Sequence, residues 1–155
     1  MKNTFASRNN CNNIKYLYFL CGFFSKSYHK EFDIPADLLG SGKNLELDLG
    51  IVSVMADVYL NDRNLGLLWK PPFRSDITQA AKPGKNRLMI EVANTWSNRI
   101  VGDTKLPEGK RYTRTNIMGP KTWEIKWEDA PLLESGLMGP VRLLPAERIK
   151  MNLTQ

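Results

Sequence analysis

One short segment, residues 94–103, combines a tryptophan with amide, guanidinium and carboxylate side chains. A ligand with an apolar face and a rim of hydroxyl groups, such as a sugar ring, needs an aromatic plane flanked by bidentate polar groups. The candidate carbohydrate-binding residues are Trp96, Asn94, Asn98, Arg99, Asp103 and, from an earlier segment, Trp69. A purely structural reading stays open, in which Trp96 plugs the end of the core and Arg99 pairs with Asp103. Trp69 likewise suits a core or inter-domain contact.

The acidic and nucleophilic residues do not form a pattern that predicts catalysis. Hydrolysis of a glycosidic bond needs two carboxylates about 5 Å or about 6.5–9.5 Å apart, and no spacing in the chain pairs its carboxylates convincingly. The single histidine, His29, falls in a predicted edge strand, and no nucleophile-elbow motif accompanies it. We therefore expect no catalytic residues in this chain.

The sequence offers little to a metal ion. It has no cysteine and histidine set with the spacing of a zinc site. Asp57 and Asp76, with backbone carbonyls, have the oxygen ligands that Ca²⁺ prefers. We expect no cofactor and keep a structural Ca²⁺ at these two residues as the alternative.

The positive charge is concentrated at the start of the chain. Of the formal net charge of +6 over 155 residues, residues 1–30 contribute +5, which leaves +1 for residues 31–155. Nucleic-acid binding needs clustered cations that displace counterions. The nearly neutral body therefore argues against a nucleic-acid partner.

Residues 1–26 form a leader that can be read in two ways. Its residues 14–24 are the most apolar run of the chain, but a helix that spans a bilayer needs about 20 such residues. The run suits the core of a signal peptide, although no cleavage site with small residues follows it. The alternative is an aromatic-rich strand at the edge of the sheet. Cys11 and Cys21 both lie in this leader, and their spacing matches neither a metal site nor a redox motif.

Period-two alternation predicts a chain of short strands. The clearest strand covers residues 54–60, followed by a turn at residues 61–64, where Asn and Asp tolerate left-handed backbone. A returning strand at 65–69 ends at Pro71 and Pro72, which cannot donate ladder hydrogen bonds. Further strands are expected at residues 27–34, 44–50, 73–78, 87–92 and 123–127, and the stretch 137–144 is expected to end in a strand, VRLL. Residues 94–103 are expected to form a loop, and residues 105–119 to be irregular.

These short strands, separated by Gly and Pro turns and accompanied by little helix, predict an all-β fold. The arrangement that fits them best is a jelly-roll β-sandwich. We divide the chain into a leader (1–26), a β-sandwich domain (27–145) and a tail (146–155).

Several motifs of the body resemble the galactose-binding-domain-like sandwich of glycoside hydrolases. They are the turn at residues 60–62, the FRSDIT segment at 73–78 and the KPGKNRLMIEVAN segment at 82–94. Four further motifs are similar to the C-terminal sandwich of large α-L-rhamnosidases, glycoside hydrolase family 106: WKPP at 69–72, NTWSNRIVGD at 94–103, LPE at 106–108 and SGLMGPV at 135–141. The resemblance covers residues 28–145 and departs at Asp62, where a turn glycine is usual.

The resemblance implies a non-catalytic carbohydrate-binding or accessory domain of a glycoside hydrolase that acts in polysaccharide degradation. Two alternatives stay open: a module that docks on a catalytic domain without binding sugar, and a truncated hydrolase fragment, since the catalytic barrel of such enzymes is absent from this sequence. The implied partners are a carbohydrate and a glycoside hydrolase catalytic domain. The implied location is the periplasm or the cell exterior.

Overall fold

The computed structural model describes residues 25–116, 119 and 125–147 of the chain. The predictions for residues 1–24, for the first two residues of the expected strand at 123–127 and for residues 148–155 lie outside the described residues. The strands in chain order are β1 Ser25–Ile34, β2 Lys43–Asp48, β3 Ile51–Val52, β4 Met55–Leu60, β5 Arg63–Leu68, β6 Arg74–Asp76, β7 Gly84–Ala93, β8 Leu137–Gly139 and β9 Arg142–Glu147. The helical elements are η1 Ala36–Leu39, α2 Ser97–Thr104 and η2 Glu108–Lys110.

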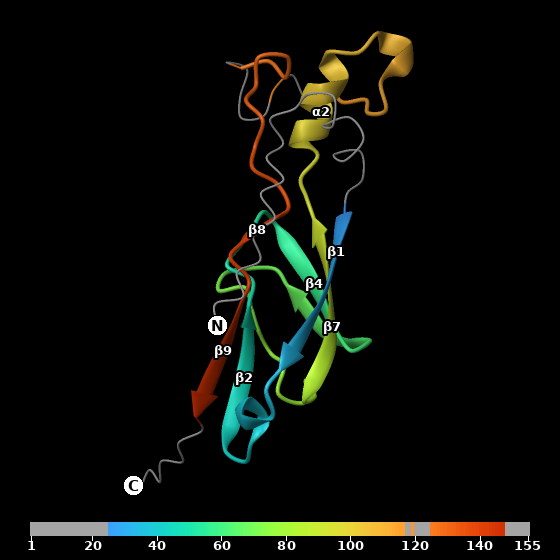
Figure 1. Ribbon diagram of the computed structural model, residues 1–155. Helices are drawn as coiled ribbons and strands as arrows, with labels where there is room; N and C mark the ends of the chain where they lie inside the picture. Colours follow the sequence, from blue (N-terminus) through green and yellow to red (C-terminus); the bar gives the residue numbers. More distant parts are fainter. Residues whose placement is uncertain (1–24, 117–118, 120–124, 148–155) are drawn as a thin grey trace, which may run out of the picture.

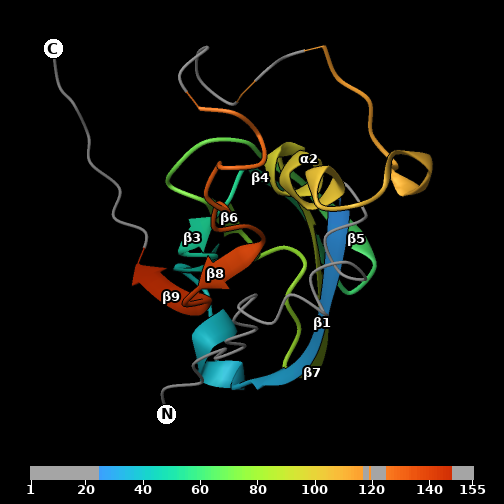
Figure 2. The ribbon, with the colours of Figure 1, turned by 90° about the horizontal axis from the view of Figure 1, so that it is seen from above.

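The strands form two main layers, as the views in Figures 1 and 2 show. Sheet A has the order β1-β7-β4-β5, and sheet B has the order β6-β2-β9. A small two-stranded sheet, β3-β8, lies beside them, and all pairs are antiparallel. The fold is an all-β sandwich, as predicted. No helix among the described residues has the length and apolar character needed to cross a bilayer.

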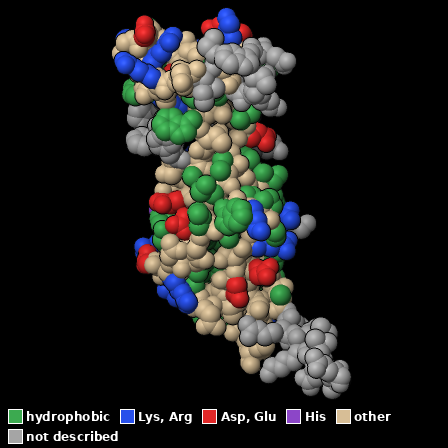
Figure 3. All heavy atoms as spheres, turned by 180° about the vertical axis from the view of Figure 1, so that it is seen from behind, with side chains coloured by type: hydrophobic (Ala, Val, Ile, Leu, Met, Phe, Trp, Pro, Cys, Tyr) green, Lys and Arg blue, Asp and Glu red, His purple; other side chains and the backbone are tan. Residues whose placement is uncertain are grey.

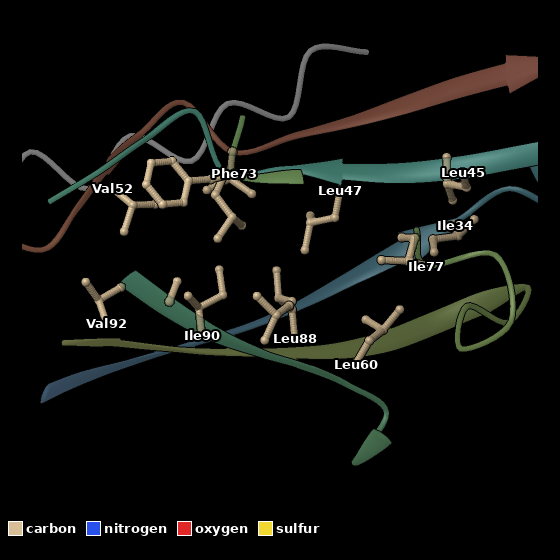
Figure 4. Packing of buried hydrophobic residues seen from close by; sticks show 14 residues of the cluster. Ile34, Leu45, Leu47, Val52, Leu60, Phe73, Ile77, Leu88, Ile90 and Val92 are labelled. Carbon is tan, nitrogen blue, oxygen red and sulfur yellow. The ribbon is translucent and has the colours of Figure 1, made fainter. Parts of the chain in front are cut away.

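The core lies between the sheets and follows the predicted alternation. Every second residue of three strands is buried: Leu45, Leu47 and Leu49 in and after β2, Ala56, Val58 and Leu60 in β4, and Leu88, Ile90 and Val92 in β7. Figure 4 shows the side chains of β4 and β7 facing Leu47, Val52 and Phe73 across the gap between the layers. Burial of these side chains, at roughly 1.5–3 kcal/mol each, is the main driving force for the fold.

The turn between β4 and β5 confirms the prediction made from its residue types. Asn61 and Asp62 have φ angles of 52° and 66°, a region that Asn and Asp tolerate better than most residues. The Asn61 side chain donates to the carbonyl of Ala80 and to Oδ1 of buried Asn86, both at 2.8 Å. These bonds tie the turn to the segment that precedes β7.

Two predictions in the second half of the chain are wrong. The expected loop at 94–103 contains helix α2, whose polar side chains bind other segments rather than solvent. The expected strand at 123–127 is not present in its described part. Instead, the carbonyls of Lys126 and Trp127 accept hydrogen bonds from Asp129 and Ala130, which makes consecutive turns and leaves Ile125 exposed. A short alternating run does not make a strand where no neighbouring strand pairs with it.

Candidate functional site

Helix α2 follows β7 after three residues and stands beyond the ends of the strands, as Figure 1 shows. We call this region, with the segments at 105–116 and 132–137 that contact it, the α2 end of the sandwich. The helix begins after Trp96, and no side chain caps its first turn. Contacts with neighbouring segments therefore set the position of the helix. Three of the predicted site residues, Asn98, Arg99 and Asp103, make these contacts.

Asn98 joins α2 to a segment 35 residues further along the chain. Its Nδ2 donates to the carbonyl of Leu133, and its Oδ1 accepts from the Leu133 amide, both at 2.7 Å. The Asn98 side chain thus satisfies both main-chain groups of one residue, as a strand partner would. Because Asn98 is buried and both its polar atoms are used, it serves to hold this segment.

Arg99 and Asp103 form a buried ion pair one helical turn apart, with 3.1 Å between Nη2 and Oδ1. Oδ2 of Asp103 accepts three further hydrogen bonds, from the amides of Tyr112 and Thr113 and from the Thr113 hydroxyl. The Arg99 guanidinium lies 4.0 Å from the centre of the Tyr112 ring. The pair therefore closes the segment at 105–113 onto the helix, as the structural reading of this motif expected.

The Arg99 side chain is less well satisfied than its partner. Nη2 is buried and forms no hydrogen bond, so its 3.1 Å contact with Asp103 is electrostatic only. A buried guanidinium in this position depends on the opposite charge and on the aromatic face beneath it. This makes Asp103 the residue on which the local arrangement depends.

Asn94 holds the start of the same returning segment. Its Oδ1 accepts from the Gly136 amide at 2.7 Å, and the neighbouring Leu137 amide donates to the Tyr28 hydroxyl at 3.2 Å. Gly136 has a φ of 94°, and a Cβ there would lie 2.5 Å from the Tyr28 hydroxyl oxygen. Glycine is therefore required where the returning segment passes β1.

The two tryptophans of the predicted set are exposed, Trp96 at 50% and Trp69 at 64%. The reading in which Trp96 plugs the core is therefore wrong, as is a core position for Trp69. Trp69 follows β5, whose Leu68 lies opposite Ala56, while the adjacent Met55 of β4 lies opposite Ala93 of β7. Trp69 is thus at the end of sheet A from which the chain continues to α2.

The structure brings five of the six predicted residues together at the α2 end. Asn94, Asn98, Arg99 and Asp103 bind other parts of the chain, which leaves Trp96 as the exposed member. Sequence reasoning missed Tyr112, Thr113 and Leu133, because nothing in their own neighbourhood indicates that they contact a helix 9 to 35 residues away.

The remaining candidates lie elsewhere. His29 is exposed in β1, an edge strand of sheet A, as predicted. Asp57 lies in sheet A and Asp76 in sheet B. Within the described ranges, no group of three or more His, Cys, Asp or Glu side chains is arranged to hold a metal ion.

Comparisons with known proteins relate the chain to parts of larger enzymes. No protein-family model matches it. A protein of Formosa agariphila named "Putative beta-glucuronidase" is 42% identical over 137 residues, which cover 76% of this chain and 12% of that protein. The structure of a rhamnosidase from Novosphingobium sp. PP1Y matches with a TM-score of 0.66 and 38% identity, over 79% of this chain and 11% of the enzyme. The chain thus spans about an eighth or less of these relatives, and it is a domain related to glycoside hydrolases.

Proposed function

We propose that this chain is a non-catalytic accessory domain of a glycoside hydrolase of the α-L-rhamnosidase type, family 106, and that its α2 end packs against a catalytic domain. The match with the Novosphingobium rhamnosidase, over a small part of that enzyme and most of this chain, supports the accessory role. The galactose-binding-like jelly-roll description and the division into leader (1–26), sandwich (27–145) and tail (146–155) remain predictions. A role in polysaccharide degradation, in the periplasm or outside the cell, belongs to the same proposal.

The observation that carries the docking role is the contrast between fixed polar groups and exposed apolar ones at the α2 end. Asn98 and Asp103 are fully engaged within the chain. Trp96, Leu132 and Leu133 are nevertheless exposed, and the Asn98 bonds hold Leu133 beside α2. Apolar side chains grouped on a rigid support are typical of a surface that another protein covers.

A chimeric enzyme tests the docking role. This chain replaces its aligned segment in the Novosphingobium rhamnosidase, and the half-life of rhamnosidase activity on heating is measured. Truncation of a central interface residue costs about 2 kcal/mol or more. We therefore expect Trp96→Asp and Leu133→Asp to shorten the half-life at least about fivefold. Leu67→Asp, at an equally exposed leucine of β5, is the matched control and should stay within about twofold.

Two results would contradict the docking role. One is a chimera whose half-life is unaffected by either substitution at the α2 end. The other is an equal loss for the Leu67 control, which would show a general effect of new surface charge.

The second candidate function is carbohydrate binding at the α2 end. The half-exposed Trp96 supports it, because its indole offers an apolar plane at the start of a helix that Asn94, Asn98, Arg99 and Asp103 help to hold in place. Calorimetric titration with rhamnose, galactose and pectic oligosaccharides tests this role. Heat that saturates and disappears in Trp96→Ala would support it, whereas heat that persists in that variant would place the sugar elsewhere.

A further inference from the structure

The outer face of sheet A, which is turned away from sheet B, carries a row of side chains across all four strands. The register places Asp57 of β4 opposite Glu91 of β7, and Glu91 opposite Ser27 of β1. On its other side, Asp57 lies opposite Leu67 of β5. Two carboxylates therefore stand side by side at the centre of the sheet.

These carboxylates are held by neutral donors rather than by cations. Tyr59 donates to Asp57 at 2.8 Å, and the Asn64 amide lies 3.3 and 3.4 Å from the two Asp57 oxygens. The Ser27 hydroxyl donates to Glu91 at 3.2 Å. Neither carboxylate forms an ion pair with another described residue. Like charges in directly opposite positions are unfavourable, and each carboxylate keeps acceptor positions for further donors.

An exposed aromatic side chain, Trp69, borders the row that contains Asp57 and Glu91. Trp69 directly follows the last residue of β5, and continued alternation from Leu67 would place it on the same face, diagonal to Asp57. The two apolar side chains are 64% and 54% exposed. Lys70 Nζ lies 5.1 Å from the indole centre. Figure 3, the side of the molecule opposite to the view of Figure 1, shows exposed hydrophobic side chains with acidic and basic side chains among and beside them.

We propose that the outer face of sheet A binds a neutral glycan, with Trp69 stacking on a sugar ring and Asp57 and Glu91 accepting hydrogen bonds from its hydroxyl groups. Sugar hydroxyls can donate to the acceptor positions of these carboxylates that Tyr59, Asn64 and Ser27 do not occupy, and hydrogen bonds to ionised acceptors are the stronger kind. A glycan that carries carboxylates would instead bring further negative charges next to Asp57 and Glu91. The face therefore selects neutral sugars and disfavours uronic acids, and it does so whether or not the α2 end docks on a catalytic domain.

Titration of the full chain with neutral and acidic oligosaccharides tests the proposal. The probes are galactan tetraose, xylohexaose and rhamnose, with tetragalacturonate as the acidic counterpart, and binding is followed by calorimetry. We expect at least one neutral probe to bind and tetragalacturonate to bind at least about tenfold more weakly, because its carboxylates are repelled by Asp57 and Glu91.

Matched substitutions locate the site. Trp69→Ala should weaken binding of the neutral probe at least tenfold, while Ile51→Ala, at a similarly exposed apolar residue of β3, should change it by less than twofold. The double substitution Asp57→Asn and Glu91→Gln keeps the shape of the face and removes its charge. It should reduce the preference for neutral over acidic probes at least fivefold while a neutral probe still binds, a combination that loss of the fold would not produce.

Three outcomes would overturn the inference. None of the neutral probes binds the folded chain; or binding is lost in Trp96→Ala and retained in Trp69→Ala; or Trp69→Asp shortens the half-life of the rhamnosidase chimera as much as Trp96→Asp does. The third result would show that a protein, not a glycan, covers this face.

Discussion

Replacing Asp103 by asparagine removes the charge on which the α2 end depends. Asp103 is buried, pairs with Arg99 at 3.1 Å and accepts three hydrogen bonds from Tyr112 and Thr113. An amide oxygen can keep part of the hydrogen bonding to Thr113, but it cannot compensate the guanidinium. The change therefore isolates the cost of leaving a buried cation without its counter-charge.

The expected loss of unfolding free energy is about 3 kcal/mol, the low end of the range for breaking a buried ion pair. Some compensation by the Tyr112 ring, 4.0 Å from the guanidinium, keeps the value from being higher. For a domain of this size the loss corresponds to a fall in Tm of about 6–12 °C. Urea denaturation followed by tryptophan fluorescence measures the free energy, and amide hydrogen exchange at residues 112 and 113 shows whether the α2 end opens first.

Asp62→Asn is the matched control. The Asp62 side chain is 85% exposed, and the change removes only one ion pair, in which Oδ1 lies 3.8 Å from Nη1 of Arg87. That change should cost less than about 0.5 kcal/mol. A loss below about 1 kcal/mol for Asp103→Asn, with unchanged exchange at residues 112 and 113, would refute the argument that this carboxylate holds the α2 end together.

Other changes test separate parts of the structure. Asn98→Ala removes two bonds to a main chain 35 residues away and should cost about 2 kcal/mol in urea denaturation; an unchanged midpoint would contradict the anchoring role. Gly50→Ala puts a Cβ 2.5 Å from the Gly139 backbone at a φ of +66°, so we expect a loss above about 2 kcal/mol by calorimetry, and a neutral result would contradict the tight contact. The hydrogen bond to Asp57 and then burial raise the pKa of Tyr59 above 10.0. The protonated phenol is the form that the fold favours, so any stability that Tyr59 adds over Tyr59→Phe should be present at pH 8 and lost as the pH rises through that raised pKa, whereas a difference that grows with pH would refute the assignment.

The layers of the sandwich were predictable from the sequence because, in each strand of the core, the alternation of apolar and polar residues shows which side chains are buried. In β2, β4 and β7 every second residue is apolar, and those are the residues that the sheets cover. The turn at Asn61 and Asp62 was predictable for a similar reason, since the ability to adopt a positive φ belongs to the residue itself. Alternation and backbone preference depend on a few neighbouring residues. They can therefore be recognised without knowing which segments pack against them.

Helix α2 could not be predicted in the same way, because it is short, rich in polar residues and has no side-chain cap. What holds it are the hydrogen bonds that Asn98 exchanges with the main chain of Leu133 and those that Thr113 donates to Asp103. The same contacts decide that Arg99 and Asp103 face inward while Trp96 faces out.

The sequence by itself determined the all-β core, its turns and the set of residue types around position 96, because periodicity and backbone preference are local. Only the tertiary structure decided which of those side chains are available. Whether a polar group is consumed within the chain depends on segments far along it. The pairing of Asp57 with Glu91 likewise arises only when β4 and β7 meet in register.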